Sequence, residues 1–338
     1  MTIRVAINGF GRIGRSVVRA LHEQGADMEV VAANDVGSVD QMAHLLKFDS
    51  VYGRFPAEVR AVDGGVQVDD HVIRFLAERE PKNLPWADLG VDVVIEATGR
   101  FRDRAAAAAH VDAGAHFVVV SAPCKGADAT FVVGVNDHTF DPEAHQVVSN
   151  ASCTTNCLVP MVKVLDDAFG VERGLMTTVH AYTGDQMLVD GPHKDLRRAR
   201  AAAFNIVPTS TGAARATSLV LEPMAGRLDG AALRVPVADG SVTDLVVALG
   251  RDVGAMEVNE AFRRAAGEGP LAAVLDFSEE PIVSSDVVGS PASCFFDAPL
   301  TLAMGDMVKV FGWYDNEWGY AHRLVDLATI MGGSRRSM

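Results

Sequence analysis

The sequence predicts an α/β protein of two domains, a Rossmann-type doubly wound parallel sheet followed by an α+β domain with a mainly antiparallel sheet. Three observations support this prediction. The glycine-rich turn Gly9–Gly14 lies between a strand pattern and a helix pattern. Strand and helix patterns alternate through the first half of the chain, as a parallel sheet requires. In the second half, strand patterns follow one another with short turns, which is typical of antiparallel pairing.

The first half begins with an apolar strand pattern at Ile3–Asn8, and a helical pattern starts at Ile13. The further strand patterns are Val30–Ala33, Val91–Ile95, Phe117–Val120, Phe131–Val133 and Gln146–Val148. The alanine-rich stretch Arg102–Ala113 predicts a helix between two of these strands. Turns that follow such strands, as at Ser121, are where parallel sheets bind ligands.

The second half begins with a helix that starts near Cys153 and ends at Gly170, because apolar residues recur there at helical spacing. Its strand patterns are Leu175–His180, Ala232–Pro236, Val242–Leu249, Ser293–Asp297, Thr301–Met304 and Met307–Tyr314. Met256–Ala266 predicts a helix between them. A last helix follows Asp315–Glu317, and Gly332–Met338 is expected to be a frayed tail.

Composition narrows the class of protein. The chain has 338 residues, 49% hydrophobic and 22% charged, which is ordinary for a globular protein of about two domains. A net charge of −14 argues against nucleic acid and anionic membrane as partners. No apolar run is long enough to span a bilayer and no leader pattern precedes the first strand, so a cytoplasmic location is expected. Four scattered cysteines predict neither a disulfide framework nor a metal site.

The turn Gly9–Gly14 has the context of a dinucleotide-binding fingerprint. Gly9 permits the tight turn, Gly11 lets the backbone approach a pyrophosphate, and Gly14 lets helix pack on strand. Asp35 follows Gly14 by about 20 residues, at the end of the next strand pattern, where an acid accepts hydrogen bonds from ribose hydroxyls. This arrangement favours NAD over NADP. The alternative is a glycine-rich turn without a ligand.

Cys153 is the best candidate nucleophile among the four cysteines. A thiol in the first turn of a helix feels the positive end of the helix dipole and nearby backbone N–H groups, and both favour the thiolate. His180, which ends a predicted strand, is the best candidate base. The alternatives remain open at this point, since unpaired cysteines are usually core residues and a histidine at a strand end is more often structural.

A dinucleotide site combined with a reactive thiol permits a particular chemistry. The thiol adds to an aldehyde, and the hemithioacetal loses hydride to a nicotinamide, which leaves a thioester. Polar residues in the second half could hold phosphate groups by charge-assisted hydrogen bonds. They are Arg197, Arg198, Arg200 and Arg234, with Thr183, Thr211 and Gly212. The alternative for the arginines is a solvated charged face.

These motifs together resemble the phosphorylating glyceraldehyde-3-phosphate dehydrogenase family from residue 2 to about residue 332. The matching segments are Ile7–Arg15, Lys47–Ser50, Ser149–Cys157, His180–Thr183, His193–Ala201, Thr209–Ala213 and Trp313–Tyr320. The resemblance implies an oxidoreductase that converts D-glyceraldehyde 3-phosphate, inorganic phosphate and NAD to 1,3-bisphosphoglycerate. It also implies an NAD-binding domain at residues 1–151, completed by the helix at 317–338, a catalytic domain at 152–316, and a homotetramer.

The resemblance also implies a role for each matching site residue. Cys153 resembles the nucleophile and His180 the general base. The implied cofactor contacts are Arg12 and Ile13 at the pyrophosphate, Asp35 at the ribose, Arg79 and Ser121 at further NAD positions, and Asn316 at the nicotinamide carboxamide. The implied ligands of the substrate's phosphate are Thr183, Arg198 and Arg234. Thr211 and Gly212 resemble the site for the attacking phosphate, with Ser152 and Thr154 nearby.

Departures from the family pattern leave alternatives open. Gly191 stands where leucine is common, near the ribose of the adjacent subunit, which weakens the case against NADP. Tyr52 and Met187 replace a common histidine and arginine, so a specialised paralogue that tolerates a thiol-alkylating inhibitor is one hypothesis. Erythrose-4-phosphate dehydrogenase, which ends in hydrolysis, is the nearest rival activity. A non-catalytic binding or scaffold protein that keeps the fold is the rival of another class.

Overall fold

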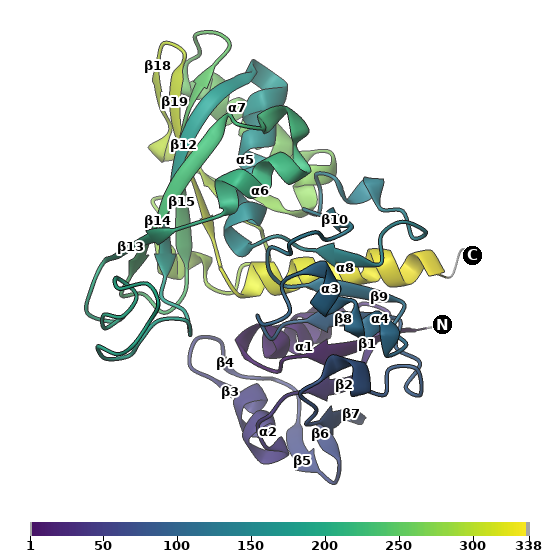
Figure 1. Ribbon diagram of the computed structural model, residues 1–338. Helices are drawn as coiled ribbons and strands as arrows, with labels where there is room; N and C mark the ends of the chain where they lie inside the picture. Colours follow the sequence, from purple (N-terminus) through teal and green to yellow (C-terminus); the bar gives the residue numbers. More distant parts are fainter. Residues whose placement is uncertain (1, 336–338) are drawn as a thin grey trace. The chain divides into compact units, whose positions relative to one another are not determined.

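A computed structural model describes residues 2–335 as two compact units (Figure 1). The first unit comprises residues up to Phe131, Asp137–Ala151 and the chain from Ala321 onward, and the second comprises Val132–Asn136 and Ser152–Tyr320. Within the described residues, no helix combines the length and apolar character that crossing a membrane requires.

The first unit is built on a nine-stranded sheet in the order β10-β11-β9-β8-β1-β2-β7-β6-β5. Neighbouring strands from β10 to β7 are parallel, and β6 and β5 continue the sheet antiparallel. The strands are β1 Ile3–Asn8, β2 Met28–Asn34, β5 Val59–Val62, β6 Gly65–Val68, β7 His71–Leu76, β8 Val93–Glu96, β9 Phe117–Val120, β10 Ala129–Thr130 and β11 Val147–Ser149, and a separate pair is β3 Phe48–Asp49 with β4 Gly53–Arg54.

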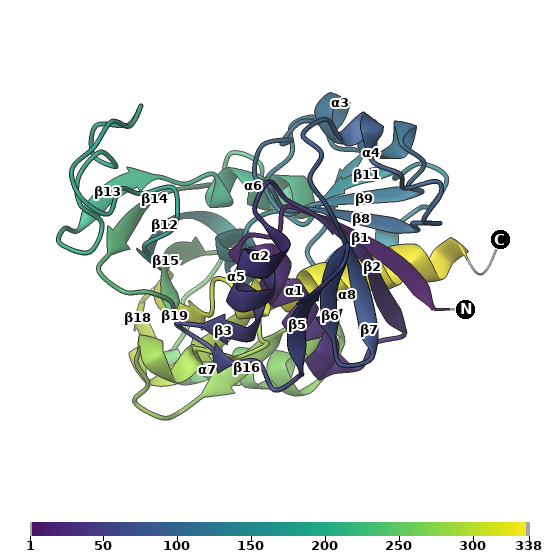
Figure 2. The same ribbon diagram turned by 90° about the horizontal axis from the view of Figure 1, so that it is seen from below.

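Helices cover both faces of this sheet (Figure 2). They are α1 Arg12–Gln24, α2 Val39–Lys47, α3 Arg104–Ala107, α4 Ala109–Asp112 and most of α8, Trp318–Ser334. Because successive strand residues point to opposite faces, Ile7 contacts α1, where a Cβ on Gly14 would lie 3.0 Å from its Cγ2. Its neighbour Ala6 packs on the other face with Ala107 of α3. The predicted doubly wound sheet is therefore confirmed.

The second unit has a sheet in the order β13-β14-β12-β15-β19-β17-β16, with β18 paired to β19. Pairing is antiparallel except between β12 and β14 and between β16 and β17, so the predicted mainly antiparallel sheet is also confirmed. The strands are β12 Val171–Ala181, β13 Val207–Ser210, β14 Leu228–Val235, β15 Ser241–Leu249, β16 Leu275–Ser278, β17 Cys294–Asp297, β18 Leu302–Met304 and β19 Met307–Tyr314.

The helices of the second unit are α5 Cys153–Phe169, α6 Ala213–Val220 and α7 Ala255–Gly267. They pack on one face of the sheet (Figure 1). The helix α5 begins where the sequence predicts, because the Ser152 side chain accepts a hydrogen bond from the Thr155 N–H, and it ends at Gly170. Asp315 caps α8 by accepting from the N–H groups of Glu317 and Trp318.

Three expectations about local structure are wrong. The apolar run Phe131–Val133 is not a strand; β10 ends at Thr130, and Phe131 is buried against the rings of Phe140 and His145. The helix expected over Arg102–Ala113 begins later, after the Asp103 cap, and is interrupted at Ala108. The expected tail is helical to Ser334, because Gly332 lets α8 approach Ile3 closely; residues 336–338 lie outside the described part of the chain.

Candidate active site

The glycine-rich turn connects β1 to α1 in the first unit, as the fingerprint predicts. Gly9 has a φ of +97°, and a Cβ there would lie 2.5 Å from the Thr98 backbone nitrogen, so only glycine fits. Around Gly11, by contrast, a Cβ would meet nothing within 4 Å. Helix α1 begins after Gly11 without a side-chain cap. Open space before an uncapped helix N-terminus suits a phosphate group.

A cavity of about 230 Å³ lies beside this turn. Four of the predicted cofactor residues line it: Gly9, Gly11, Asp35 and Arg79. The Asp35 carboxylate accepts from the Phe10 N–H at 2.8 Å and from the Gly37 N–H at 3.2 Å, so it ties the glycine turn to the end of β2. Each carboxylate oxygen can accept further hydrogen bonds, which suits ribose hydroxyls. The residues present therefore fit a dinucleotide.

Three other predicted cofactor residues of the first unit do not line this cavity. Arg12 and Ile13 are in the first turn of α1, and the Arg12 guanidinium makes two hydrogen bonds to the Asp49 carboxylate, at 3.0 and 3.2 Å. The hydrogen bonds to Asp49 hold the pKa of that carboxyl below its usual value, although burial opposes them. Ser121 follows β9, and its N–H donates to the Glu96 carbonyl.

A buried polar network under the cavity was missed by the sequence analysis. Glu96, which is 1% exposed, accepts from the Asn8 amide at 2.6 Å and from the Thr98 N–H at 2.9 Å. Trp86 donates to His110 Nδ1, so the proton of a neutral His110 is on Nε2, which lies 3.1 Å from Glu96. Two members of this network had a recognisable place in the sequence, because Asn8 directly precedes the first glycine of the turn and Thr98 follows β8.

Cys153 and His180 come together in the second unit. Cys153 opens α5 and His180 is near the end of β12, and the Sγ lies 3.4 Å from Nε2. The other cysteines lack such a partner among the described residues. Cys157 and Cys294 are buried, and burial raises the pKa of Cys124 to about 11.

The environment of the pair disfavours the charged form of both groups. Burial raises the pKa of the Cys153 thiol to about 11, against the lowering effects of the Arg234 guanidinium and of hydrogen bonds from Thr154. Burial, and after it the charge of Arg234, lowers the pKa of His180 to about 3. The sequence suggested a thiolate at the helix N-terminus, but desolvation outweighs that effect.

Arg234 contacts the far side of this imidazole from β14. Its Nη1 lies 2.7 Å from His180 Nδ1 and 2.9 Å from the Ala181 carbonyl oxygen, which is itself 2.7 Å from Nδ1. A guanidinium only donates, so Nδ1 accepts from Arg234 and the imidazole proton is on Nε2 in this arrangement. If Nη1 moved away, Nδ1–H could donate to Ala181, and the Nε2 lone pair would face the sulfur.

Two residues beside Cys153 are held by hydrogen bonds within the unit. Ser152 caps α5 and lies 2.8 Å from the Thr155 hydroxyl. The Thr154 hydroxyl is 2.8 Å from the hydroxyl of Tyr314, a fully buried residue whose ring also meets His180 edge-on. Tyr314 lies in the family segment Trp313–Tyr320, but no role was predicted for it.

The predicted phosphate ligands all belong to the second unit, but they do not all contact one another. Arg198 donates to Thr209 at 2.8 Å and to Asp185 at 2.6 Å. Burial is the main cause that lowers the pKa of Arg234. The charge of Arg198 lowers this pKa further, and the charge of Asp185 raises it. The remaining ligands lie in turns: Thr183 follows β12, and Thr211 and Gly212 precede α6.

Asn316, the predicted carboxamide ligand, lies between β19 and α8 and is 5% exposed. Its Oδ1 accepts from the Ser241 hydroxyl at 2.6 Å. Ser241 also went unnoticed in the sequence. The residues described here contain no group of three or more histidine, cysteine or acidic side chains arranged for a metal ion.

Comparisons with known proteins agree with the resemblance. Residues 3–104 match the glyceraldehyde 3-phosphate dehydrogenase NAD binding domain, and residues 152–316 match the glyceraldehyde 3-phosphate dehydrogenase C-terminal domain. Glyceraldehyde-3-phosphate dehydrogenase 2 of Streptomyces arenae is 60% identical over 334 residues, 99% of this chain and all of the relative. The Mycobacterium tuberculosis glyceraldehyde-3-phosphate dehydrogenase is 57% identical over 345 residues, with 99% and 100% covered. The two rival activities are not favoured.

Proposed function

The chain belongs to the glyceraldehyde-3-phosphate dehydrogenase family, an NAD-dependent oxidoreductase family, and from that premise we propose how its residues act. The first unit holds NAD, and the second unit, with Cys153 as nucleophile and His180 as general base, oxidises D-glyceraldehyde 3-phosphate to 1,3-bisphosphoglycerate. The observation that carries this proposal is the 3.4 Å approach of the Cys153 sulfur to the His180 Nε2.

The cofactor role of the first unit is supported by the cavity beside the glycine turn. Gly9 and Gly11 would admit the pyrophosphate next to the N-terminus of α1, with Arg12 and Ile13 in the same first turn. Asp35 would accept from the ribose hydroxyls, and Arg79 lines the same space. Ser121 and Asn316 are the remaining residues of the proposed set. Bound NAD supplies one thing to the chemistry, which is an acceptor for hydride.

His180 and Cys153 carry the proposed oxidation. As the sulfur attacks the aldehyde carbon, a carbon–sulfur bond forms, and the thiol proton passes through His180 to the carbonyl oxygen, which gives a hemithioacetal. His180 then removes that hydroxyl proton while the hydride departs, and a thioester on Cys153 remains. His180 can act as this base when its Nε2 carries a lone pair, which requires the Arg234 Nη1 to leave Nδ1 and the ring proton to be on Nδ1.

Inorganic phosphate completes the proposed cycle. A phosphate oxygen attacks the thioester carbon, the carbon–sulfur bond breaks, and Cys153 is released as the acyl phosphate forms. Thr211 and Gly212 before α6, with Ser152 and Thr154, are proposed to hold the attacking phosphate. The phosphate of the substrate is assigned to Thr183, Arg198 and Arg234. Arginine side chains suit phosphate because they donate in a planar fork.

Steady-state NADH formation from glyceraldehyde 3-phosphate tests this proposal. With phosphate, turnover is expected to continue; without it, NADH should stop near one equivalent per Cys153, because the thioester persists. Cys153→Ser should abolish NADH formation, while Cys124→Ser, a half-buried cysteine outside the site, should retain it. Equal steady rates with and without phosphate would contradict the acyl-transfer step, and activity in Cys153→Ser would contradict the nucleophile.

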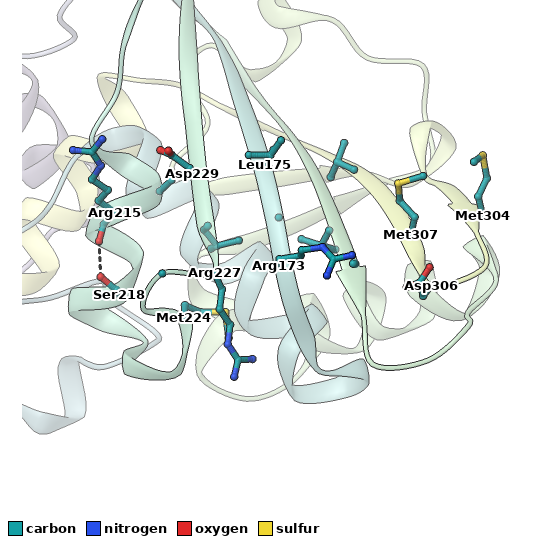
Figure 3. A pocket seen from close by; sticks show the side chains of 17 residues that line it. Arg173, Leu175, Arg215, Ser218, Met224, Arg227, Asp229, Met304, Asp306 and Met307 are labelled. Atoms are coloured by element: carbon teal, nitrogen blue, oxygen red, sulfur yellow. Dashed lines mark hydrogen bonds between the residues drawn. The ribbon is translucent and has the colours of Figure 1, made fainter.

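We further propose that the chain works in the cytoplasm as a homotetramer. Its four cysteines are free, as a reducing compartment keeps them. A cavity of about 1120 Å³ lies along the sheet of the second unit (Figure 3). Neither Cys153 nor His180 lines it. Leu175 and Met304 beside it are 67% and 70% exposed, and an exposed apolar patch indicates an interface.

A second copy of the chain is the proposed occupant of this face. The cavity is lined by Arg173 and Arg227 and also by Asp229 and Asp306. Because a twofold axis brings the same surface of each copy together, a surface with both signs of charge can complement itself. Leu175→Asp should lower the mass measured by light scattering during size-exclusion chromatography. An unchanged tetramer, or a wild-type monomer, would contradict this interface.

A further inference from the structure

Ser241 connects two residues of the proposed site. It begins β15, is 1% exposed, and follows Gly240, whose φ of +83° and close approach to the Ser284 carbonyl fix the start of the strand. The Ala181 N–H donates to the Ser241 Oγ at 3.1 Å, and the Oγ lies 2.6 Å from the Asn316 Oδ1. Ala181 directly follows His180 in the chain.

Counting hydrogens assigns the direction of each bond. A serine hydroxyl has one proton to donate, and one of its lone pairs already accepts from Ala181. The proton therefore goes to the Asn316 Oδ1. If the Asn316 amide were turned over, the Ser241 Oγ would accept twice, and its own buried proton would have no acceptor among residues 2–335. An unmade buried hydrogen bond is costly, so the amide keeps the orientation with Oδ1 toward Ser241.

The other end of the Asn316 amide is then a donor of known identity. In the described part of the chain, the Asn316 Nδ2 makes no hydrogen bond, and it is not sealed from solvent. An N–H₂ group presented in this way pairs with a carbonyl oxygen and not with an amide nitrogen. The nicotinamide ring carries both groups on one carboxamide, so the orientation of Asn316 decides which of them is favoured.

We propose that Ser241 is a positioning residue that locks the Asn316 amide with its N–H₂ group outward, and thereby selects the carbonyl oxygen of the nicotinamide carboxamide. This inference rests on the proposed function, which assigns Asn316 to the carboxamide. Ser241 touches neither substrate nor cofactor in this role. It acts through Asn316, and it ties that side chain to the strand end that carries His180.

Thionicotinamide adenine dinucleotide tests the proposal because it replaces the carboxamide oxygen by sulfur, a weaker acceptor. The measured quantity is the discrimination ratio, kcat/KM with NAD divided by kcat/KM with the thio cofactor. In Ser241→Ala this ratio should fall about 3- to 10-fold, the value of roughly one hydrogen bond. Ser241→Thr retains the hydroxyl and should retain the ratio.

A matched control separates this role from a general effect of altering β15. Thr243 is two residues further along the strand, fully buried, and its hydroxyl has no partner among the residues described. Thr243→Ala should leave the discrimination ratio as in the wild type. The alkylation rate of Cys153 without cofactor should change less than twofold in Ser241→Ala, since the Cys153–His180 contact does not include Ser241.

The variant Asn316→Ala distinguishes two kinds of failure. If it leaves the ratio unchanged, the assignment of Asn316 in the proposed function is wrong. If Asn316→Ala lowers the ratio but Ser241→Ala does not, the inference about Ser241 is overturned. The double variant should be no lower than Asn316→Ala alone, and additive losses would also overturn it. If Ser241→Ala does not fold, Ser241→Cys, with a weaker donor, must show the loss of discrimination.

Discussion

Replacing Arg234 by methionine should move the pKa values of Cys153 and His180 in the same direction, both upward. The guanidinium lowers the pKa of the thiol and also that of the imidazole, because a positive charge favours the thiolate and disfavours the imidazolium. Methionine keeps most of the apolar stem but removes the charge and the donor. Arg234→Lys is the matched control, since it keeps the charge.

The expected size follows from the 2.7 Å contact between the Arg234 Nη1 and the His180 Nδ1. Charges centred about 4 Å apart interact by about 4 kcal/mol at an effective dielectric constant near 20, which corresponds to about 3 pH units. Arg234 is partly exposed and is the smaller of the two causes, so a rise of roughly 1 to 2 in the pKa of His180 is expected. The value remains below the ordinary one near 6.5, because burial, the larger cause, is unchanged.

Nitrogen-15 NMR of the histidine rings measures both the pKa and the tautomer. The His180 signals are assigned by their absence in His180→Asn. In the wild type, Nδ1 accepts from Arg234, so the neutral ring should carry its proton on Nε2. In Arg234→Met, Nδ1–H should donate to the Ala181 carbonyl instead. The alkylation rate of Cys153 at pH 9 should fall, because less thiolate is present when the pKa of the thiol is higher.

Three results would refute this reasoning. The first is a pKa of His180 that does not change in Arg234→Met, which would mean that the guanidinium is too well screened to matter. The second is an equal change in Arg234→Lys and Arg234→Met, which would show that packing, and not charge, sets the pKa. Opposite movements of the thiol and imidazole pKa values would also exclude Arg234 as the common cause.

Three further predictions concern other parts of the chain. Gly9→Ala should weaken NAD binding about tenfold or more in a fluorescence titration, because a Cβ would meet the Thr98 backbone. Gly25→Ala is the control and should bind NAD normally, because Gly25 also has a positive φ but has open space around it. Gly312→Ala should lower the free energy of unfolding in urea by roughly 1 to 3 kcal/mol, since its Cβ would lie 2.6 Å from the Met161 sulfur, and no loss would contradict the packing. Burial lowers the pKa of His322 to about 4 in the folded state, so on acidification the unfolded histidine binds its proton first. The free energy of unfolding should therefore fall by roughly 2 kcal/mol between pH 7 and pH 5. In His322→Gln this part of the pH dependence should vanish.

Most of the elements that position the site were predictable from local signals. The turn Gly9–Gly14 needs glycine for backbone reasons that the motif states, and the cap at Ser152 fixes the start of α5. Apolar period and turn residues were enough for β1, β9, β12 and β19. The family resemblance then assigned roles that no local pattern supports, such as that of Asn316.

The missed elements have weaker sequence signals. The antiparallel strands β5, β6 and β7 extend the parallel sheet, yet β7 mixes exposed and buried residues without the apolar run that marked β8. Helix α6 is short and rich in alanine, and its cap residue is Gly212. At Phe131 the apolar run predicted a strand that does not form, because this side chain is buried against other rings and does not belong to a paired strand.

The missed site residues depend on contacts between distant segments. Ser241 meets Asn316 and Ala181 only because β15 lies between β12 and β19. Tyr314 reaches Thr154 and Thr178 from the far end of β19. One sequence does not reveal such pairings, since serine and tyrosine at strand ends are common. The balance of burial against the helix dipole at Cys153 is likewise a property of the folded unit.

The position of Arg234 couples binding of the substrate phosphate to the tautomer of His180. The guanidinium that is proposed to bind the substrate phosphate also contacts the His180 Nδ1 through its Nη1. A substrate phosphate that draws this group away would leave Nδ1 free to donate to Ala181, and the Nε2 lone pair would then face the sulfur, which is the tautomer a general base needs. An aldehyde without phosphate should therefore show a lower kcat as well as a higher KM, and in Arg234→Met the kcat difference between the two aldehydes should shrink. If the aldehyde without phosphate differs only in KM, then binding of the substrate phosphate by Arg234 does not change the tautomer of His180.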